Sequence, residues 1–276
     1  MITKKLYKTF LFIKRDFLML WSYKVAFFSA YLHIIILLFV FFALGTWSST
    51  FSPETTTVGD QYKSAGGFIE FILLGSIGWA FQWSIVTSGS ASLRKEMLQG
   101  TIESVLSAPV SPFTIVASYT LFGTVNGILE IMGFIIIGKA AFDVDIYGSL
   151  LYGIVIIMLT FVMMFGLNLI FSGVSIQAKQ IGSLIPILQM TSLFLCEVYI
   201  PLNAFPPVMS TIAQFYPFYY TIRALRNVLS PAADVYMFAE SALSVGALAV
   251  VFLVAGIVTL KVFLAKSKRE GSLAFY

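Results

Sequence analysis

Long apolar runs separated by short polar segments dominate this chain. Crossing the hydrocarbon core of a bilayer takes about 20 helical residues, and six runs meet that length. The predicted spans cover about residues 25–44, 67–93, 113–138, 146–174, 181–200 and 239–264. The pattern therefore predicts an all-α integral membrane protein whose six-helix transmembrane domain occupies residues 25–264.

The first 24 residues have a different pattern, in which apolar and basic side chains alternate with a helical period. One face carries the apolar residues Leu6, Phe10, Ile13, Phe17, Leu20 and Trp21, and the other carries Lys4, Lys5, Lys8 and Arg15. Such a helix lies on anionic headgroups with its apolar face in the membrane. We predict a cytoplasmic interfacial helix over residues 1–24.

A polar segment, residues 94–112, interrupts the apolar pattern between the second and third spans. Gly100 and Thr101 provide a break and an N-cap, and an apolar face follows at helical spacing, formed by Ile102, Val105, Leu106 and Pro109. A helix of about two turns is not stable alone in water, so this face must rest on another protein surface. On pattern alone, an ordinary interfacial loop helix also fits.

Residues 201–236 form a second distinctive segment, which is too apolar for a free loop. Five prolines divide it into pieces too short to cross the membrane, namely Pro201, Pro206, Pro207, Pro217 and Pro231. The pattern predicts an extracytoplasmic re-entrant segment of two short helices. Residues 265–276 then form a basic cytoplasmic tail.

The distribution of charge gives the orientation. Of the 17 lysines and arginines, all but Lys63, Lys139, Arg223 and Arg226 fall on the side that also holds both termini. Basic residues accumulate on the cytoplasmic side of membrane proteins. We therefore predict a multi-pass protein of the cytoplasmic (inner) membrane with cytoplasmic N- and C-termini.

Composition agrees with this class and excludes others. Hydrophobic residues make up 59% of the chain and charged residues 11%, and the mean hydropathy is +0.92, which lies far outside the range of soluble domains. The single cysteine, Cys196, excludes an internal disulfide framework, and together with His33 it offers no metal site. The sequence contains no Gly-rich phosphate loop, so we expect no nucleotide cofactor and no ATPase activity in this chain.

The order of residues around the polar segment carries a family resemblance. Glu96, Gly100-Thr101-Ile102-Glu103, Val105-Leu106 and the stretch from Ala108 to Pro112 resemble the cytoplasmic signature of the type-2 ABC export permeases. The resemblance implies a type V ABC exporter fold with a coupling helix in residues 94–112. It also implies contact with an ABC ATPase subunit, which would bind Mg-ATP, through Arg94, Glu96, Gly100, Thr101, Ile102, Glu103, Leu106 and Pro109.

The same resemblance extends to the segment between the fifth and sixth spans. FPPVMSTIAQFYPFYYTIRALR resembles the family's pattern there, which makes Pro206, Pro217, Arg223 and Arg226 candidates at the outer end. The chain departs from the family at Cys196-Glu197, where a Ser-Gly pair is frequent. The resemblance further implies a second permease copy, in a homodimer or a heterodimer. The basic residues behind the net charge of +4 gather next to the spans, so we expect no nucleic-acid partner.

Polar side chains inside the spans are the remaining candidates. A charge in mid-span costs several kcal/mol unless it is paired, hydrated or protonated, so Glu130 is a functional candidate by default. The predicted substrate-pathway set is Glu70, Gln82, Asn126, Glu130 and Glu197. Glu96 and Glu103 are either solvated loop acids or partners of basic residues on the ATPase or the N-terminal helix. His33 is either a proton-linked switch or, as is more common for a single histidine between helices, a hydrogen-bonded structural residue.

Three functions compete. The first is a permease that exports a hydrophobic or amphipathic substrate such as a drug, lipid, lipid-linked glycan or peptide, with a cavity lined, by resemblance, by the second and fifth spans. A membrane-embedded enzyme would use Glu70, Glu130 or Glu197, yet no span holds a pair of acids at helical spacing. A passive channel would call for a repeated pore motif, and none is visible.

Overall fold

The structure is a computed structural model that describes residues 65–90, 92–93, 111–144, 148–177, 184–202, 205–230 and 234–270, together with residues 14–15, 17–18, 22, 32, 36, 39–40, 43, 96 and 100. In these residues all regular structure is helical, which confirms the predicted all-α class. The helices are α3 (Ala65–Ser90), α6 (Pro112–Phe142), α7 (Leu150–Gln177), α8 (Leu184–Leu195), α9 (Pro207–Ala213), α10 (Pro217–Leu229) and α11 (Val235–Glu270).

Four of these helices, α3, α6, α7 and α11, are long and apolar enough to cross a membrane. They coincide with the predicted second, third, fourth and sixth spans, with ends that differ by a few residues. α11 extends six residues beyond the predicted end at 264 and carries Lys266 and Arg269 in its last turns. The first predicted span lies largely outside the described residues, although Leu32 and Ile36 within it are helical.

The structure describes residues 184–200 of the predicted fifth span. α8 has 12 residues and ends at Leu195, five residues before the predicted end. Residues 178–183, directly before α8, lie outside the described residues. Pro186 is the third residue of α8. The chain then turns over residues 196–202, a segment that we call the 196–202 turn.

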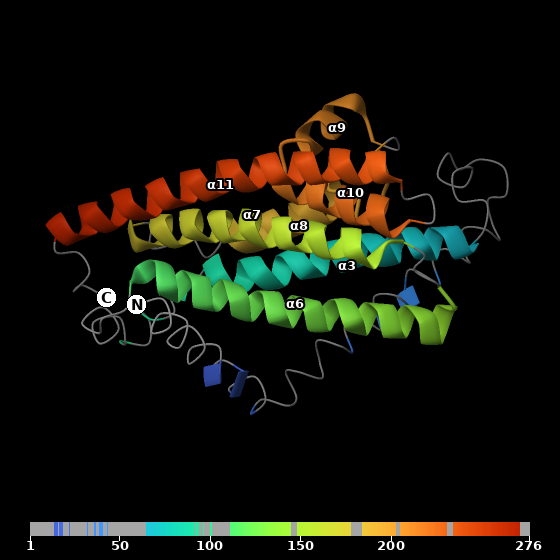
Figure 1. Cartoon of the computed structure of the whole chain (residues 1–276), viewed down its shortest axis with the longest axis horizontal. Coiled ribbons are helices and arrows are strands. Elements are labelled where there is room, and N and C mark those ends of the chain that lie inside the picture. Colours follow the sequence, from blue (N-terminus) through green and yellow to red (C-terminus); the bar gives the residue numbers. More distant parts are fainter. Residues whose placement is uncertain are drawn as a thin grey trace.

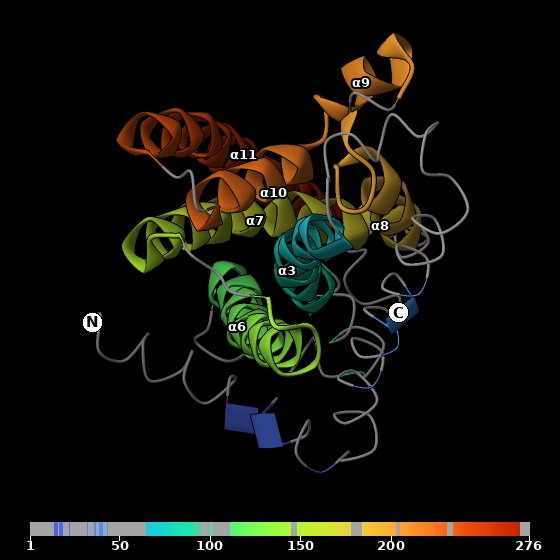
Figure 2. The same ribbon diagram turned by 90° about the vertical axis from the view of Figure 1, so that its right-hand side faces the viewer.

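The long helices form a layered bundle with α3 at its centre (Figures 1 and 2). α3 packs against α6, α7, α10 and α8, while α11 covers the outer side of α7 and α10. In Figure 1, α3, α7 and α11 run in one direction and α6 runs in the other. Most of α3 is buried, whereas most of α6 and α11 is not, so α3 is the internal helix of the bundle.

The contact between α7 and α11 depends on glycine. An added Cβ at Gly166 would lie 2.4 Å from the carbonyl carbon of Phe252 and 2.5 Å from the backbone nitrogen of Leu253. An added Cβ at Gly256 would in turn lie 2.3 Å from the carbonyl oxygen of Gly166. Small residues allow membrane helices to bring their backbones into direct contact. The sixth-span helix is therefore fixed to α7 by backbone approach at Gly166 and Gly256.

The two short helices α9 and α10 lie within residues 201–236, the segment in which the prolines predicted two short helices. Each begins with proline at its first position, Pro207 and Pro217, where the ring is compatible with the helix and no hydrogen bond is lost. Pro206 occupies the N-cap position of α9. α10 packs against α3, α7 and α11, so this segment is part of the bundle. Its placement at the membrane edge stays a prediction.

Candidate functional site

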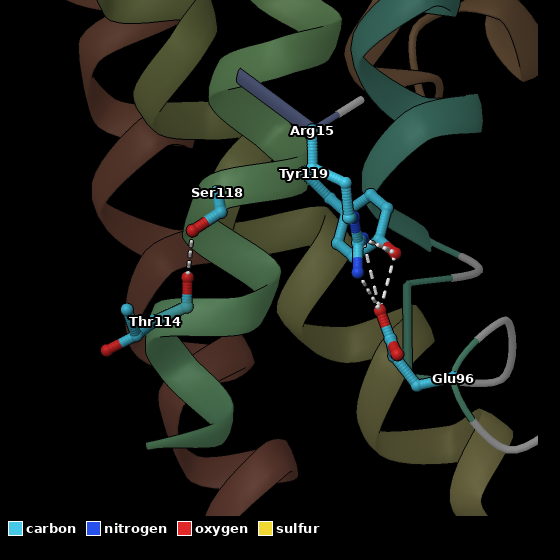
Figure 3. A network of polar contacts seen from close by, with 5 residues as sticks. All are labelled: Arg15, Glu96, Thr114, Ser118 and Tyr119. Atoms are coloured by element: carbon cyan, nitrogen blue, oxygen red, sulfur yellow. Dashed lines mark hydrogen bonds and ion pairs between the residues drawn. The ribbon is translucent and has the colours of Figure 1, made fainter. Parts of the chain in front are cut away.

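A buried carboxylate lies just beyond the C-terminal end of α3, at Glu96, which is 1% exposed. Its Oε1 accepts hydrogen bonds from Arg15 Nη1 at 3.3 Å and Nη2 at 3.2 Å, and from the Tyr119 hydroxyl at 2.7 Å. Arg15 Nη2 also donates to the Tyr119 hydroxyl oxygen at 2.6 Å. Figure 3 shows the three side chains converging. We call this triangle the Arg15–Glu96–Tyr119 network.

Local sequence places Tyr119 at this point. α6 begins after Ser111, whose hydroxyl accepts a hydrogen bond from the Thr114 backbone N–H at 3.2 Å, and Pro112 occupies the first helical position. Tyr119 lies two turns later, in a cluster of buried apolar residues with Leu93. The Tyr119 ring is thereby fixed by packing, and the Arg15 guanidinium carbon lies 5.6 Å from its centroid.

The network satisfies a carboxylate that would otherwise be costly to bury. A buried charge is tolerated only when it is paired and its oxygens accept hydrogen bonds. Here the donors come from the N-terminal segment and from α6, while the acceptor precedes the predicted coupling helix. Three parts of the chain that are distant in sequence are thus joined at one carboxylate oxygen.

The predicted coupling residues are only partly within the described structure. Glu96 is buried in the network, and its contact with Arg15 is one of the two pairings that the sequence allowed. Gly100 has a φ of +68°, a conformation that glycine adopts readily, and a Cβ added there would meet no atom within 4 Å among the described residues. The other six predicted residues lie outside the described residues, namely Arg94, Thr101, Ile102, Glu103, Leu106 and Pro109.

A second polar group, which sequence reasoning missed, adjoins this network along the α3–α6–α7 interface. Asn168 Nδ2 donates to the Ile85 carbonyl oxygen at 3.0 Å and to the Thr120 hydroxyl oxygen at 3.1 Å, and both Asn168 and Thr120 are fully buried. Ser172 donates to the Gly89 carbonyl oxygen at 3.1 Å. The sequence signal was a lone asparagine in an apolar span, a residue that commonly bonds across membrane helices. Tyr119 carried no comparable signal.

The predicted substrate-pathway residues do not form one cluster. Asn126 Nδ2 donates to Glu130 Oε1 at 2.8 Å and to the Ser84 hydroxyl oxygen at 2.9 Å, so the structure brings two of the five together. Gln82 is fully buried and donates to the Gly78 carbonyl oxygen at 3.0 Å. Glu70 is half-buried near the start of α3. His33 lies outside the described residues.

The remaining member of the set, Glu197, belongs to the 196–202 turn. Its φ is +57°, in the left-handed region, and its carboxylate accepts a hydrogen bond from the Leu202 backbone N–H at 2.8 Å. Its carbonyl oxygen accepts one from Arg226 Nη2 at 2.7 Å. Arg223, the other predicted outer arginine, is exposed and donates to the Tyr219 hydroxyl oxygen at 2.9 Å.

The left-handed backbone at Glu197 gives a stability prediction. Glycine adopts this conformation without the roughly 1 kcal/mol cost that a side chain incurs. We therefore expect Glu197→Gly to be more stable than Glu197→Ala by about 1 kcal/mol, since both lose the carboxylate but only alanine keeps the strain. Thermal unfolding of the two purified variants in one detergent measures the difference. Equal stability, or a more stable alanine variant, would contradict the assigned backbone conformation.

Comparison with known proteins adds the family. A family model described as ABC-2 type transporter matches residues 7–230, which is most of the chain and includes the Arg15–Glu96–Tyr119 network and the 196–202 turn. No curated protein matches the chain significantly.

Proposed function

The chain belongs to the ABC-2 type transporter family as a membrane component of transport, and on this premise we propose that it is the permease subunit of an ATP-driven exporter. The observation that carries the proposal is the Arg15–Glu96–Tyr119 network. It anchors the beginning of the predicted coupling segment to α6 and to the N-terminal segment. A force that the predicted coupling helix transmits to Glu96 would therefore pass into α6 and the N-terminal segment through these hydrogen bonds.

The proposed topology has six spans with the type V exporter arrangement and both termini in the cytoplasm. The directions of α3, α6, α7 and α11 support it, because they fit an alternating path in which α8 belongs to the fifth span. The exposed basic residues Lys261, Lys266 and Arg269 lie toward the C-terminal end of α11, on the same side of the bundle as the end of α3. Their position supports a cytoplasmic location for the Glu96 end of the bundle.

The proposed complex contains a separate ABC ATPase subunit, which binds Mg-ATP, and a second permease copy, most simply in a homodimer. ATP binding would draw the ATPase subunits together, move the coupling helices and narrow the cavity between the permeases. By resemblance, α3 and α8 line that cavity. The exposed apolar side chains of α8, namely Leu184, Ile187, Met190 and Phe194, support a hydrophobic or amphipathic cargo, such as a drug, lipid, lipid-linked glycan or peptide.

The test uses Glu103→Lys and Leu106→Lys, which change the charged rim and the apolar face of the predicted coupling helix. We expect each to lower co-purification of the ATPase, or the vanadate-sensitive ATP hydrolysis of the complex, at least tenfold, because burying a lysine at an interface costs more than 1.4 kcal/mol. Affinity purification from native membranes measures both, and membrane insertion should be unchanged.

Ser104→Lys is the matched control, because residue 104 lies on the opposite side of the predicted helix from residue 106. It should keep most of the ATPase and its activity. Normal co-purification and hydrolysis in all three variants would overturn the coupling assignment, and hydrolytic activity in the isolated chain would favour an enzyme.

A further inference from the structure

Arg226 of α10 joins three parts of the chain at the end of α3 opposite Glu96. Its Nη2 donates to the Glu197 carbonyl oxygen at 2.7 Å and to the Phe71 carbonyl oxygen at 3.2 Å. Its guanidinium carbon lies 3.6 Å from the centroid of the Phe71 ring. The side chain therefore holds the beginning of α3 against the 196–202 turn that follows α8.

The turn has the shape that this contact requires. The left-handed backbone at Glu197 ends the helical direction of α8, and the carboxylate closes the turn through the Leu202 N–H. The neighbouring Cys196 and Val198 are fully buried. The Arg226 contact thus depends on a strained turn that is itself packed into the bundle.

α3 contributes space for the contact at Gly75. A Cβ added there would lie 2.3 Å from the Val198 carbonyl oxygen and 2.8 Å from Arg226 Nη2. Real Cβ atoms do not approach backbone oxygens so closely, so even alanine would separate α3 from the turn. Gly75 and Arg226 are therefore two independent requirements for the same closed geometry.

We propose that Arg226 is a latch residue, which holds α3 and the 196–202 turn together and releases them when the transport pathway opens. The closed latch follows from the contacts alone, whereas its release rests on the proposed function. α3 and α8 correspond to the two spans that would line the cavity, and the latch joins them where substrate would leave. The Glu96 network lies beyond the other end of α3, roughly 30 Å away along the helix axis, so movement of α3 would reach both sites.

Arginine suits this role better than lysine would. Its planar guanidinium donates to two carbonyl oxygens while it stacks on an aromatic ring, and a lysine ammonium does not reproduce that geometry. Arg223, one turn earlier on the same helix, is exposed and contacts Tyr219. It carries the same charge without joining α3 to the turn and is the matched control.

The chain provides its own reporter for the test. Cys196 is its only cysteine and is fully buried beside Glu197, so opening of the latch should expose a single thiol. The measurement is the rate at which a membrane-impermeant methanethiosulfonate labels the purified chain, followed by intact mass. Local opening that exposes a buried group raises its labelling in proportion to the open population.

We expect Arg226→Gln and Gly75→Ala each to raise the labelling rate about tenfold or more, since each loses charge-assisted bonds or close packing. Arg226→Lys should give an intermediate rate, and Arg223→Gln should label as slowly as the wild type. Size-exclusion chromatography in the same detergent confirms that each variant is folded. Slow labelling of folded Arg226→Gln and Gly75→Ala, or equally fast labelling of Arg223→Gln, would overturn the latch.

Release is tested on the wild-type complex with its ATPase. ATP and vanadate should raise Cys196 labelling about tenfold over the nucleotide-free complex, an effect that a purely structural arginine would not produce. Unchanged labelling would overturn release while leaving the closed contact in place. Failure to purify any ATPase with the chain would contradict the proposed function, and the variant measurements on the isolated chain would still decide the latch.

Discussion

Exchanging Glu96 for alanine should abolish coupled ATP hydrolysis and lower the free energy of unfolding by about 3 kcal/mol, because it removes a buried carboxylate that accepts hydrogen bonds from both Arg15 and Tyr119. The Arg15 side chain is 38% exposed, so water can hydrate part of its guanidinium once the carboxylate is removed. The Glu96 side chain is 1% exposed, so water does not take the place of its carboxylate in the buried site. Thermal unfolding and vanadate-sensitive hydrolysis of the co-purified complex measure the two effects.

A matched series separates charge from packing at this site. Tyr119→Phe keeps the ring beside Arg15 and removes one hydroxyl, so we expect a loss of about 1 kcal/mol and partial activity. Arg15→Met combined with Glu96→Gln should be less destabilising than the sum of the single changes, because neither charge is then left without its partner. Strictly additive losses would show that Arg15 and Glu96 do not interact.

Gly166→Ala should destabilise the protein by about 3 kcal/mol or more, the second of the two largest effects we expect. The new Cβ would meet backbone atoms of Phe252 and Leu253, which do not move aside as a flexible side chain does. α7 and α11 would have to separate, and the buried contacts along both helices would loosen. The measurement is thermal unfolding, together with the yield of monodisperse protein in detergent.

Gly246→Ala on α11 is the control for this experiment. A Cβ added at Gly246 would lie 3.9 Å from the nearest atom, a methyl carbon of Leu159. The substitution should be neutral or slightly stabilising, since alanine favours the helix over glycine. Equal behaviour of Gly166→Ala and Gly246→Ala would contradict the close packing of α7 on α11.

The long helices could be predicted because their signal is local. An apolar run long enough to cross the bilayer core is sufficient to predict a membrane helix, and α3, α6, α7 and α11 each overlap such a predicted run. The early end of α8 could not be predicted, because it depends on one left-handed residue, Glu197, inside an apolar run. The family resemblance indicated a departure at this position without giving its geometry.

The Arg15–Glu96–Tyr119 network shows why the contacts within a site could not be predicted from the sequence. Charge pattern alone allowed Glu96 to pair with the N-terminal segment or with a partner protein, and it gave no means of choosing. Which partner Glu96 takes depends on how α6 places Tyr119 beside Arg15, although the two residues are 104 positions apart in the sequence. Such convergence is set by tertiary packing, which a single sequence does not encode in any local pattern.

The central position of α3 has a consequence for how the chain is made. α3 is the least apolar of the four long helices, and it carries buried polar side chains, including Ser76, Gln82 and Ser90. During synthesis it emerges before α6 and α7, so lipid would face those groups until the later helices arrive. Retention beside the insertion machinery, until α7 has been translated to its end at residue 177 of 276, would protect them. Biogenesis of this protein should then depend on the pace of translation after residue 90.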